Sequence, residues 1–251
     1  MSNLHLFAEG GYSFLEGGLP YSQGVIAAPG FELHRIRFTR PLPVAEGFAW
    51  IRQHLTQQQR PLTSLASCEL RSPTAFTLQG FKNFNKGYVE VLTDWGLFRN
   101  KLNPVARSNL APQFDPPDEP GFYAFTYTMP QTMEGPRDWV IAGSGEWPED
   151  KPFPEGIIAR GDQSPSGIAT KARYVLDTMQ ARAQGLKADW SRLTAAQIYT
   201  VQEIAHLISP EFAPRGLLSA GLSWHICRPP IQELDFEMDV RSVQHERVVH
   251  V

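Results

Sequence analysis

The sequence predicts an α+β fold of two similar units in tandem, each a mixed β-sheet with two helices packed on one face. The first observation is an internal repeat: a shift of 128 positions lays residues 60–70 onto residues 188–198. The second is an apolar helical stripe before each copy, formed by Val44, Phe48, Ile51 and Leu55 and by Ala172, Leu176, Met179 and Ala183. The third is a series of segments with strand periodicity between the helices.

The first unit is expected to cover residues 1–130. In residues 31–38 (FELHRIRF), His34, Ile36 and Phe38 alternate with two arginines, which is typical of a half-buried strand. Pro41 and Pro43 are expected to end it. Residues 121–129 (GFYAFTYTM) are rich in aromatics and strongly β-prone. The other predicted elements are helices at 44–57 and 80–95, a strand at 65–71 and a short strand within 103–111.

The second unit is expected to cover residues 138–251, after a Pro/Gly-containing connector at 130–138. Ser164 before Pro165 is typical of an N-cap with proline at the first helical position, and Gly185 is well placed to end a helix at 165–184. The other predicted elements are strands at 139–142, 193–201, 222–228 and 234–243 and a second helix at 203–218.

Composition excludes several partners and locations. The 251 residues are 42% hydrophobic, which is enough for stable cores. A formal charge of −3 without a basic stretch argues against nucleic acid. No segment approaches the roughly 20 apolar residues that span a bilayer, so no membrane association is expected. The two cysteines, Cys68 and Cys227, form no disulfide framework, which favours the cytoplasm.

The last predicted strand, LDFEMDVR, has two contrasting faces. Alternation sends Leu234, Phe236, Met238 and Val240 to one face and Asp235, Glu237, Asp239 and Arg241 to the other. The apolar face is expected to pack on the helices. The acidic face is either a solvated sheet surface or, if another unit covers it, a set of carboxylates that must be paired or protonated.

Five short motifs carry a family resemblance. They are residues 20–25 (PYSQGV), 84–88 (FNKGY), 104–108 (PVARS), 141–145 (IAGSG) and the terminal strand 234–240. Their order and spacing resemble those of the RidA/YjgF superfamily, whose members are trimers of a small α/β unit with ligand sites in the clefts between units. The chain is therefore similar to a tandem, diverged member. The resemblance implies a homo-oligomer, most simply a trimer of chains that gives six units.

The same resemblance implies the site residues. Arg107 matches the arginine that grips the carboxylate of an imine or enamine acid, although a lone arginine more often forms a surface salt bridge. The family's water-activating glutamate matches Asp235 or Glu237. The second unit has Gly221 in place of Arg107, so a complete site needs the arginine of one unit and the acid of another. The remaining implied substrate contacts are Tyr21, Ser144, Gly145 and Asn109.

Some of these residues also have structural interpretations. Tyr21 can equally pin the N-terminal arm, and Ser144 with Gly145 can equally form a strand-end turn. Common cofactor motifs are absent: the sequence has no GxGxxG after a strand, no GxxxxGK[ST], no HExxH and no paired CxxC, and its seven histidines are scattered. No cofactor and no metal are therefore expected.

Hydrolysis of an activated imine fits these limits, because it needs only charge neutralisation, orientation and an acid/base group. The segments PVARSN, GSGE and WHICRPP resemble those of deaminases of the 2-aminomuconate and 2-amino-5-chloromuconate type. The predicted function is a cofactor-independent deaminase that converts an enamine or imine carboxylic acid to a keto or hydroxy acid and ammonia. A muconate would need a second cation, for which Arg228 and Arg40 are candidates. The alternatives are a non-catalytic protein that binds small carboxylic acids and a chorismatase-like lyase.

Overall fold

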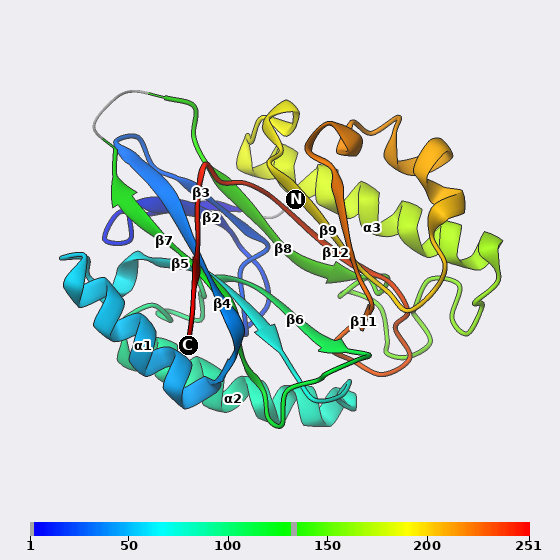
Figure 1. Ribbon diagram of the computed structural model, residues 1–251, viewed down its shortest axis with the longest axis horizontal. Coiled ribbons are helices and arrows are strands. Elements are labelled where there is room, and N and C mark those ends of the chain that lie inside the picture. The colour runs from blue at the N-terminus through cyan, green and yellow to red at the C-terminus, as the bar shows by residue number, and fades with distance from the viewer. Residues whose placement is uncertain (1–2, 132–134) are drawn as a thin grey trace.

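Two β-sheets pack against each other between layers of helices (Figure 1) in the computed structural model, which describes residues 3–131 and 135–251. The seven-stranded sheet has the order β1 (Leu4–Phe7), β2 (Tyr12–Leu15), β3 (Gly24–Ala27), β8 (Trp139–Gly145), β12 (Glu237–Ser242), β9 (Ala195–Tyr199) and β10 (Leu222–His225). The six-stranded sheet has the order β11 (Cys227–Arg228), β6 (Ala106–Pro112), β5 (Leu65–Arg71), β7 (Gly121–Pro130), β4 (Phe31–Pro43) and β13 (His245–Val249). The α+β fold class is confirmed.

The regular helices cover the outer faces of the sheets. Helices α1 (Val44–Gln57) and α2 (Leu78–Asp94) pack on the six-stranded sheet, and α3 (Pro165–Leu186) packs on the seven-stranded sheet. The Ser164 hydroxyl caps α3 by accepting the N–H of Gly167 at 3.2 Å. Helix α3 continues through Gly185 and ends at Lys187, which has a left-handed φ of 57°. None of the described helices is long and apolar enough to cross a membrane.

The predicted second helix at 203–218 is wrong. This segment contains short turns instead, the 3-10 turns η3 (Ala205–Leu207) and η5 (Leu217–Ala220) around the π-turn η4 (Ile208–Phe212). Pro210 and Pro214 both lack an N–H donor and clash with the preceding turn of a helix, so a regular helix cannot pass through them.

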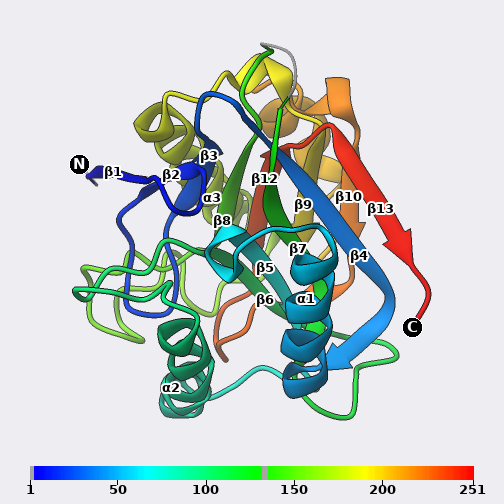
Figure 2. The same ribbon diagram turned by 90° about the vertical axis from the view of Figure 1, so that its left-hand side faces the viewer.

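The sheets exchange strands between the two halves of the sequence. Strands β1 to β3, which the sequence patterns did not predict, join the sheet of the second half, and β11 and β13 join that of the first (Figure 2). The predicted strand 222–228 is interrupted at Ile226, and its two parts belong to different sheets. The unit boundaries at 130 and 138 stay a prediction, because residues 132–134 of the connector lie outside the described residues.

The facing surfaces of the two sheets carry buried charges. Arg35 of β4 donates two hydrogen bonds to Glu69 of β5, at 2.6 Å and 2.7 Å, and both side chains are buried. Burial alone would raise the pKa of Glu69, but the Arg35 guanidinium lowers it below its ordinary value. Asp239 of β12 accepts hydrogen bonds from Ser108 at 2.6 Å and from Tyr199 at 2.9 Å. The acidic face of the last strand is therefore covered by the other sheet and is not solvated.

We expect Arg35→Met to lose about 3 to 5 kcal/mol of unfolding free energy, because it leaves the Glu69 carboxylate buried without its partner. The double variant Arg35→Met/Glu69→Leu should lose less than this single variant, since it removes both charges. Because the pKa of Glu69 is lower in the folded state, the pair contributes fully above its unfolded pKa and is lost as pH falls. Urea denaturation of wild type and both variants at pH 7 and pH 4 measures this, and equal losses in the two variants at pH 7 would contradict it.

Candidate active site

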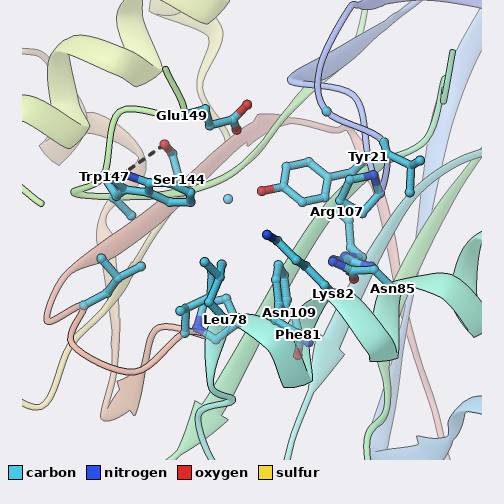
Figure 3. A pocket seen from close by; sticks show the side chains of 18 of the residues that line it. Tyr21, Leu78, Phe81, Lys82, Asn85, Arg107, Asn109, Ser144, Trp147 and Glu149 are labelled. Atoms are coloured by element: carbon cyan, nitrogen blue, oxygen red, sulfur yellow. Dashed lines mark hydrogen bonds between the residues drawn. The ribbon is translucent and has the colours of Figure 1, made fainter. Parts of the chain in front are cut away.

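A cavity of about 510 Å³ lies where α2 and the two sheets meet (Figure 3). Both halves of the sequence and the N-terminal arm contribute to its wall. Its polar and charged lining residues include Tyr21, Lys82, Asn85, Lys86, Arg107, Asn109, Ser144, Glu149 and Glu237. The arginine and the acid that the sequence assigned to different units thus line one cavity within a single chain.

Arg107 is a buried cation that has no carboxylate partner among the described residues. It lies on β6 with 2% of its surface exposed, and its Nη2 donates to Oδ1 of Asn85 at 2.7 Å. In the described part of the chain its Nη1 finds no hydrogen-bond partner. The guanidinium carbon lies 4.7 Å from the ring centroid of Tyr88 and 5.1 Å from that of Tyr21. Burial lowers the pKa of Arg107, and the aromatic faces offset part of that desolvation. Such a group is suited to bind an anionic ligand.

Glu237 stands at the start of β12, between Gly145 of β8 and Tyr199 of β9. Its side chain is buried and forms no ion pair with the cations of the described residues. Burial raises the pKa of Glu237 well above its ordinary value, and the negative charges of Asp239 and Glu146 raise it further. Both effects favour the protonated form of this acid at the cavity wall.

Gly143 leaves the space that the Glu237 carboxyl group occupies. A Cβ at this position would lie 2.3 Å from Oε1 of Glu237 and 3.1 Å from Oγ of Ser108, both on the side where the sheets meet. Any side chain here would push the carboxyl group out of its place. Gly143, which lies within β8, is therefore required for a steric reason.

Asp235 does not line this cavity. Its carboxylate binds Nζ of Lys171 and accepts a hydrogen bond from Nε2 of Gln163 at 2.9 Å. Because β12 begins at Glu237, Asp235 lies before the strand and is not part of its alternating face. The two acids, which the sequence predicted on one face, therefore have different surroundings.

Glu146 faces away from the cavity and holds the segment before Glu237. Its two carboxylate oxygens accept the backbone N–H groups of Asp235 at 2.6 Å and of Phe236 at 3.1 Å. The Lys171 ammonium lies 3.5 Å away, and burial raises the pKa of Glu146 to about 7. Glu146 is thus a positioning residue for the backbone that leads into β12.

The four other predicted contacts, Tyr21, Ser144, Gly145 and Asn109, all line the cavity. Burial raises the pKa of Tyr21 to about 12, so its hydroxyl keeps its proton and can donate; it points toward the cavity centre in Figure 3. Oδ1 of Asn109 accepts from Ser72 at 2.9 Å, while Nδ2 of Asn109 is buried and has no partner among the described residues. Two unsatisfied donors, on Arg107 and Asn109, therefore lie beside the same space.

The predicted second cations do not reach the cavity. Arg228 binds Gln113 and Arg40 binds the carbonyl of Val251, both on the surface. Sequence reasoning missed Lys82 and Lys86 of α2, which do line it. The helical spacing could have indicated them, because positions 78, 81, 82 and 86 lie on the same face of α2 as Asn85, the partner of Arg107.

The chain also matches a known family over nearly its whole length. The sequence model of a family described as "2-aminomuconate deaminase CnbZ" matches residues 4–247. The chain belongs to this family. It is 43% identical over 251 residues to a 2-amino-5-chloromuconate deaminase of Comamonas testosteroni, across 99% of this chain and all of that one.

Two solved structures are also similar to this member of the deaminase family. A chorismatase matches with a TM-score of 0.51 and 10% identity, over 93% of this chain and 77% of its own. The YjgF gene product of E. coli matches 47% of this chain and 88% of its own, with 14% identity and a TM-score of 0.32. At 10% identity, the chorismatase shows a shared fold and nothing about the reaction.

We expect Arg107→Lys to fold normally and to weaken binding of unsaturated carboxylic acids by about 2 to 5 kcal/mol. Lysine keeps the charge but cannot form the bidentate contact, and its ammonium loses the stacking on the aromatic rings. Calorimetric titration with a muconate measures this. Arg228→Lys is the matched control, because Arg228 does not line the cavity. Wild-type affinity in the Arg107→Lys variant would remove Arg107 from the ligand site.

Proposed function

We propose that the protein is a deaminase that hydrolyses a 2-aminomuconate-type enamine or imine carboxylic acid to the keto or hydroxy acid and ammonia. The observation that carries this proposal is one cavity that holds both a buried arginine without a carboxylate partner and a buried carboxylic acid. The 43% identity to a 2-amino-5-chloromuconate deaminase over the whole chain supports it.

In this proposal Arg107 binds the carboxylate next to the amino-bearing carbon. The free Nη1 supplies a donor that no described protein group occupies, and the free Nδ2 of Asn109 supplies another. The Tyr21 hydroxyl and the Ser144 hydroxyl add donors from two further walls of the cavity. With the carboxylate fixed, the reacting carbon lies one bond away, so its distance to the Glu237 carboxyl group is restricted.

Glu237 then acts first as an acid and afterwards as a base. Its proton moves to the enamine carbon, the nitrogen lone pair forms the C=N bond, and Glu237 becomes a carboxylate beside an iminium ion. The carboxylate takes a proton from water as the water oxygen attacks the C=N carbon. Glu237 returns this proton to the amino group. As ammonia leaves, the Glu237 carboxylate takes the proton of the hydroxyl group, so the carbonyl forms and Glu237 is protonated again. One water is consumed and one ammonia released, so the acid is regenerated without a cofactor.

We expect Glu237→Gln to lower kcat by about 10²-fold or more while ligand affinity stays near that of wild type. Asp235→Asn should keep most of its activity in the folded fraction, although it weakens the Lys171 ion pair and lowers stability. Because the acid form starts the reaction and burial raises the pKa of Glu237, kcat/KM should fall on the alkaline side. Ammonia release, measured across pH for wild type and both amide variants, tests these expectations. Wild-type rates in both variants would contradict this role for Glu237.

A muconate carries a second carboxylate, and Lys82 is our candidate to bind it. Its ammonium points into the cavity from α2 in Figure 3, and Lys86 lines the cavity one helical turn further on. Arg107 lies deep in the wall, whereas Lys82 is exposed, so the two cations are at different depths. An extended dicarboxylate can therefore have one end buried and the other near the mouth.

We expect Lys82→Met to weaken binding of a dicarboxylate substrate by about tenfold, the scale of one charge-assisted hydrogen bond. Binding of a monocarboxylate iminoacid should be nearly unchanged. Lys151→Met, at an exposed lysine that does not line the cavity, is the control. The comparison of KM for the two substrates measures the effect. An equal loss for both substrates would show that Lys82 does not select the second carboxylate.

We also propose a homo-oligomer, most simply the trimer of chains that the resemblance implies, in the cytoplasm. Exposed apolar side chains support an interface: Phe114 is 70% exposed, and Ile226 lies near it, since the N–H of Gln113 donates to the carbonyl of Ile226 at 2.9 Å. Both free cysteines are buried, which agrees with a reducing compartment. We expect light scattering at micromolar concentration to give three times the chain mass, and a monomer would contradict this.

A further inference from the structure

A second group of chemically reactive side chains lies away from the cavity, where β13 runs beside β4 (Figure 2). Nε2 of His34 is 2.8 Å from Oε1 of Glu32, and Nε2 of His245 is 3.6 Å from Oε2 of the same carboxylate. The ring centroids of the two histidines are 4.6 Å apart. One potential ligand atom from each of the three side chains lies within 4.8 Å of the other two.

The strand geometry explains why these three side chains meet. Glu32 and His34 are two residues apart on β4, so they share a face of the sheet. Strand β13 pairs with β4 in parallel and places His245 directly opposite His34. All three side chains therefore extend from backbone that is fixed by the ladder, on the side of the sheet that carries α1.

We propose that Glu32, His34 and His245 bind one divalent transition-metal ion, with zinc as the best match. Two imidazoles and one carboxylate are a common zinc donor set, with bonds of about 2.0 to 2.2 Å, so that tetrahedral ligand atoms lie about 3.4 Å apart. The observed separations lie around that value and require only small rotations of partly exposed side chains. A hollow of about 310 Å³ beside His34 and His245 leaves room for water as a further ligand.

The surroundings contain both favourable and opposing charges. The hollow is also lined by His54 and Gln58 at the C-terminal end of α1, where the helix dipole favours a cation. Arg247 lines the same hollow and opposes a cation, while the carboxylate of Glu246, which also lines it, binds Arg35 and Arg241. Removing the Arg247 charge should therefore strengthen metal binding.

A bound ion would connect the C-terminal strand to the first-half sheet. Strand β13 is exposed along most of its length, and its neighbour in the sheet is β4. The sequence pattern did not reveal this site, because His34 and His245 are far apart in the chain and match no metal-binding spacing. The ion lies outside the cavity that Arg107 and Glu237 line, so this inference does not depend on the proposed deaminase reaction.

The experiment is calorimetric titration of the chelator-treated full-length protein with zinc chloride, together with melting curves with and without zinc. We expect saturation at one ion per chain in the micromolar range or tighter, and a higher melting temperature with zinc. His245→Ala and Glu32→Gln should each weaken binding at least tenfold and remove the shift in melting temperature. Arg247→Met should bind zinc several-fold more tightly.

Two controls distinguish this site from unspecific binding. His5→Ala removes a surface histidine that also lies 3.1 Å from a glutamate, Glu16, but has no second imidazole beside it, so the variant should bind zinc like wild type. His245→Ala should keep the circular-dichroism spectrum and the zinc-free melting temperature of wild type, which shows that it is folded. No saturation at one ion per chain would overturn the proposal, as would wild-type zinc affinity in His245→Ala.

Discussion

The contact between the polar faces of the two sheets is the constraint on which the site depends. Each sheet buries an apolar face under helices, and the facing surfaces bring an apolar cluster and a set of charged residues together between the sheets. A charge in that position must be paired or neutralised. Arg35 with Glu69 and Asp239 with its three donors meet this requirement within the protein. Arg107, which lines the cavity, has no acidic partner in the described part of the chain, and one of its donors is unsatisfied there. The ligand site is thus the place where this pairing is left incomplete.

The local repeat was predictable, but the exchange of strands was not. The repeat reappears as helix, 3-10 turn and strand in both halves, and the turns Leu62–Ser64 and Trp190–Arg192 differ by the predicted 128 positions. These elements follow from periodicity within short windows. By contrast, β3 pairs with β8 across more than a hundred residues, and β1 to β3 are too short for a periodic signal. Pairing between such distant strands depends on which sheet edges remain open, and local patterns do not contain that information.

The limit of local sequence patterns also explains why most of the predicted site residues line the cavity and Asp235 does not. Arg107, Tyr21, Asn109 and Glu237 were predictable because each lies in a motif whose place in the fold is fixed by its own strand or arm. Asp235 was placed with Glu237 by alternation, which holds only where the strand has begun, and β12 begins two residues later. A buried lysine on α3 then takes Asp235 out of the cavity. That contact joins distant segments and has no local signature.

Fusion of two units in one chain allows each copy to keep a different half of the site. Strands β5 and β6 of the first copy and β9 and β10 of the second form matching parallel pairs. In the first copy Arg107 lies opposite Cys68. The repeat places Ala196 at the position of Cys68, and Ala196 lies opposite Leu222. Leu222, and not the predicted Gly221, therefore occupies the place of Arg107. Neither residue can bind a carboxylate. The acid, in turn, belongs to the last strand of the second copy, where the first copy has the aromatic strand β7. In an assembly of identical single units, every unit would have to carry both the arginine and the acid. Here the two copies could diverge separately, one keeping Arg107 and the other Glu237. Mispairing of the two copies would leave a buried arginine without its acid.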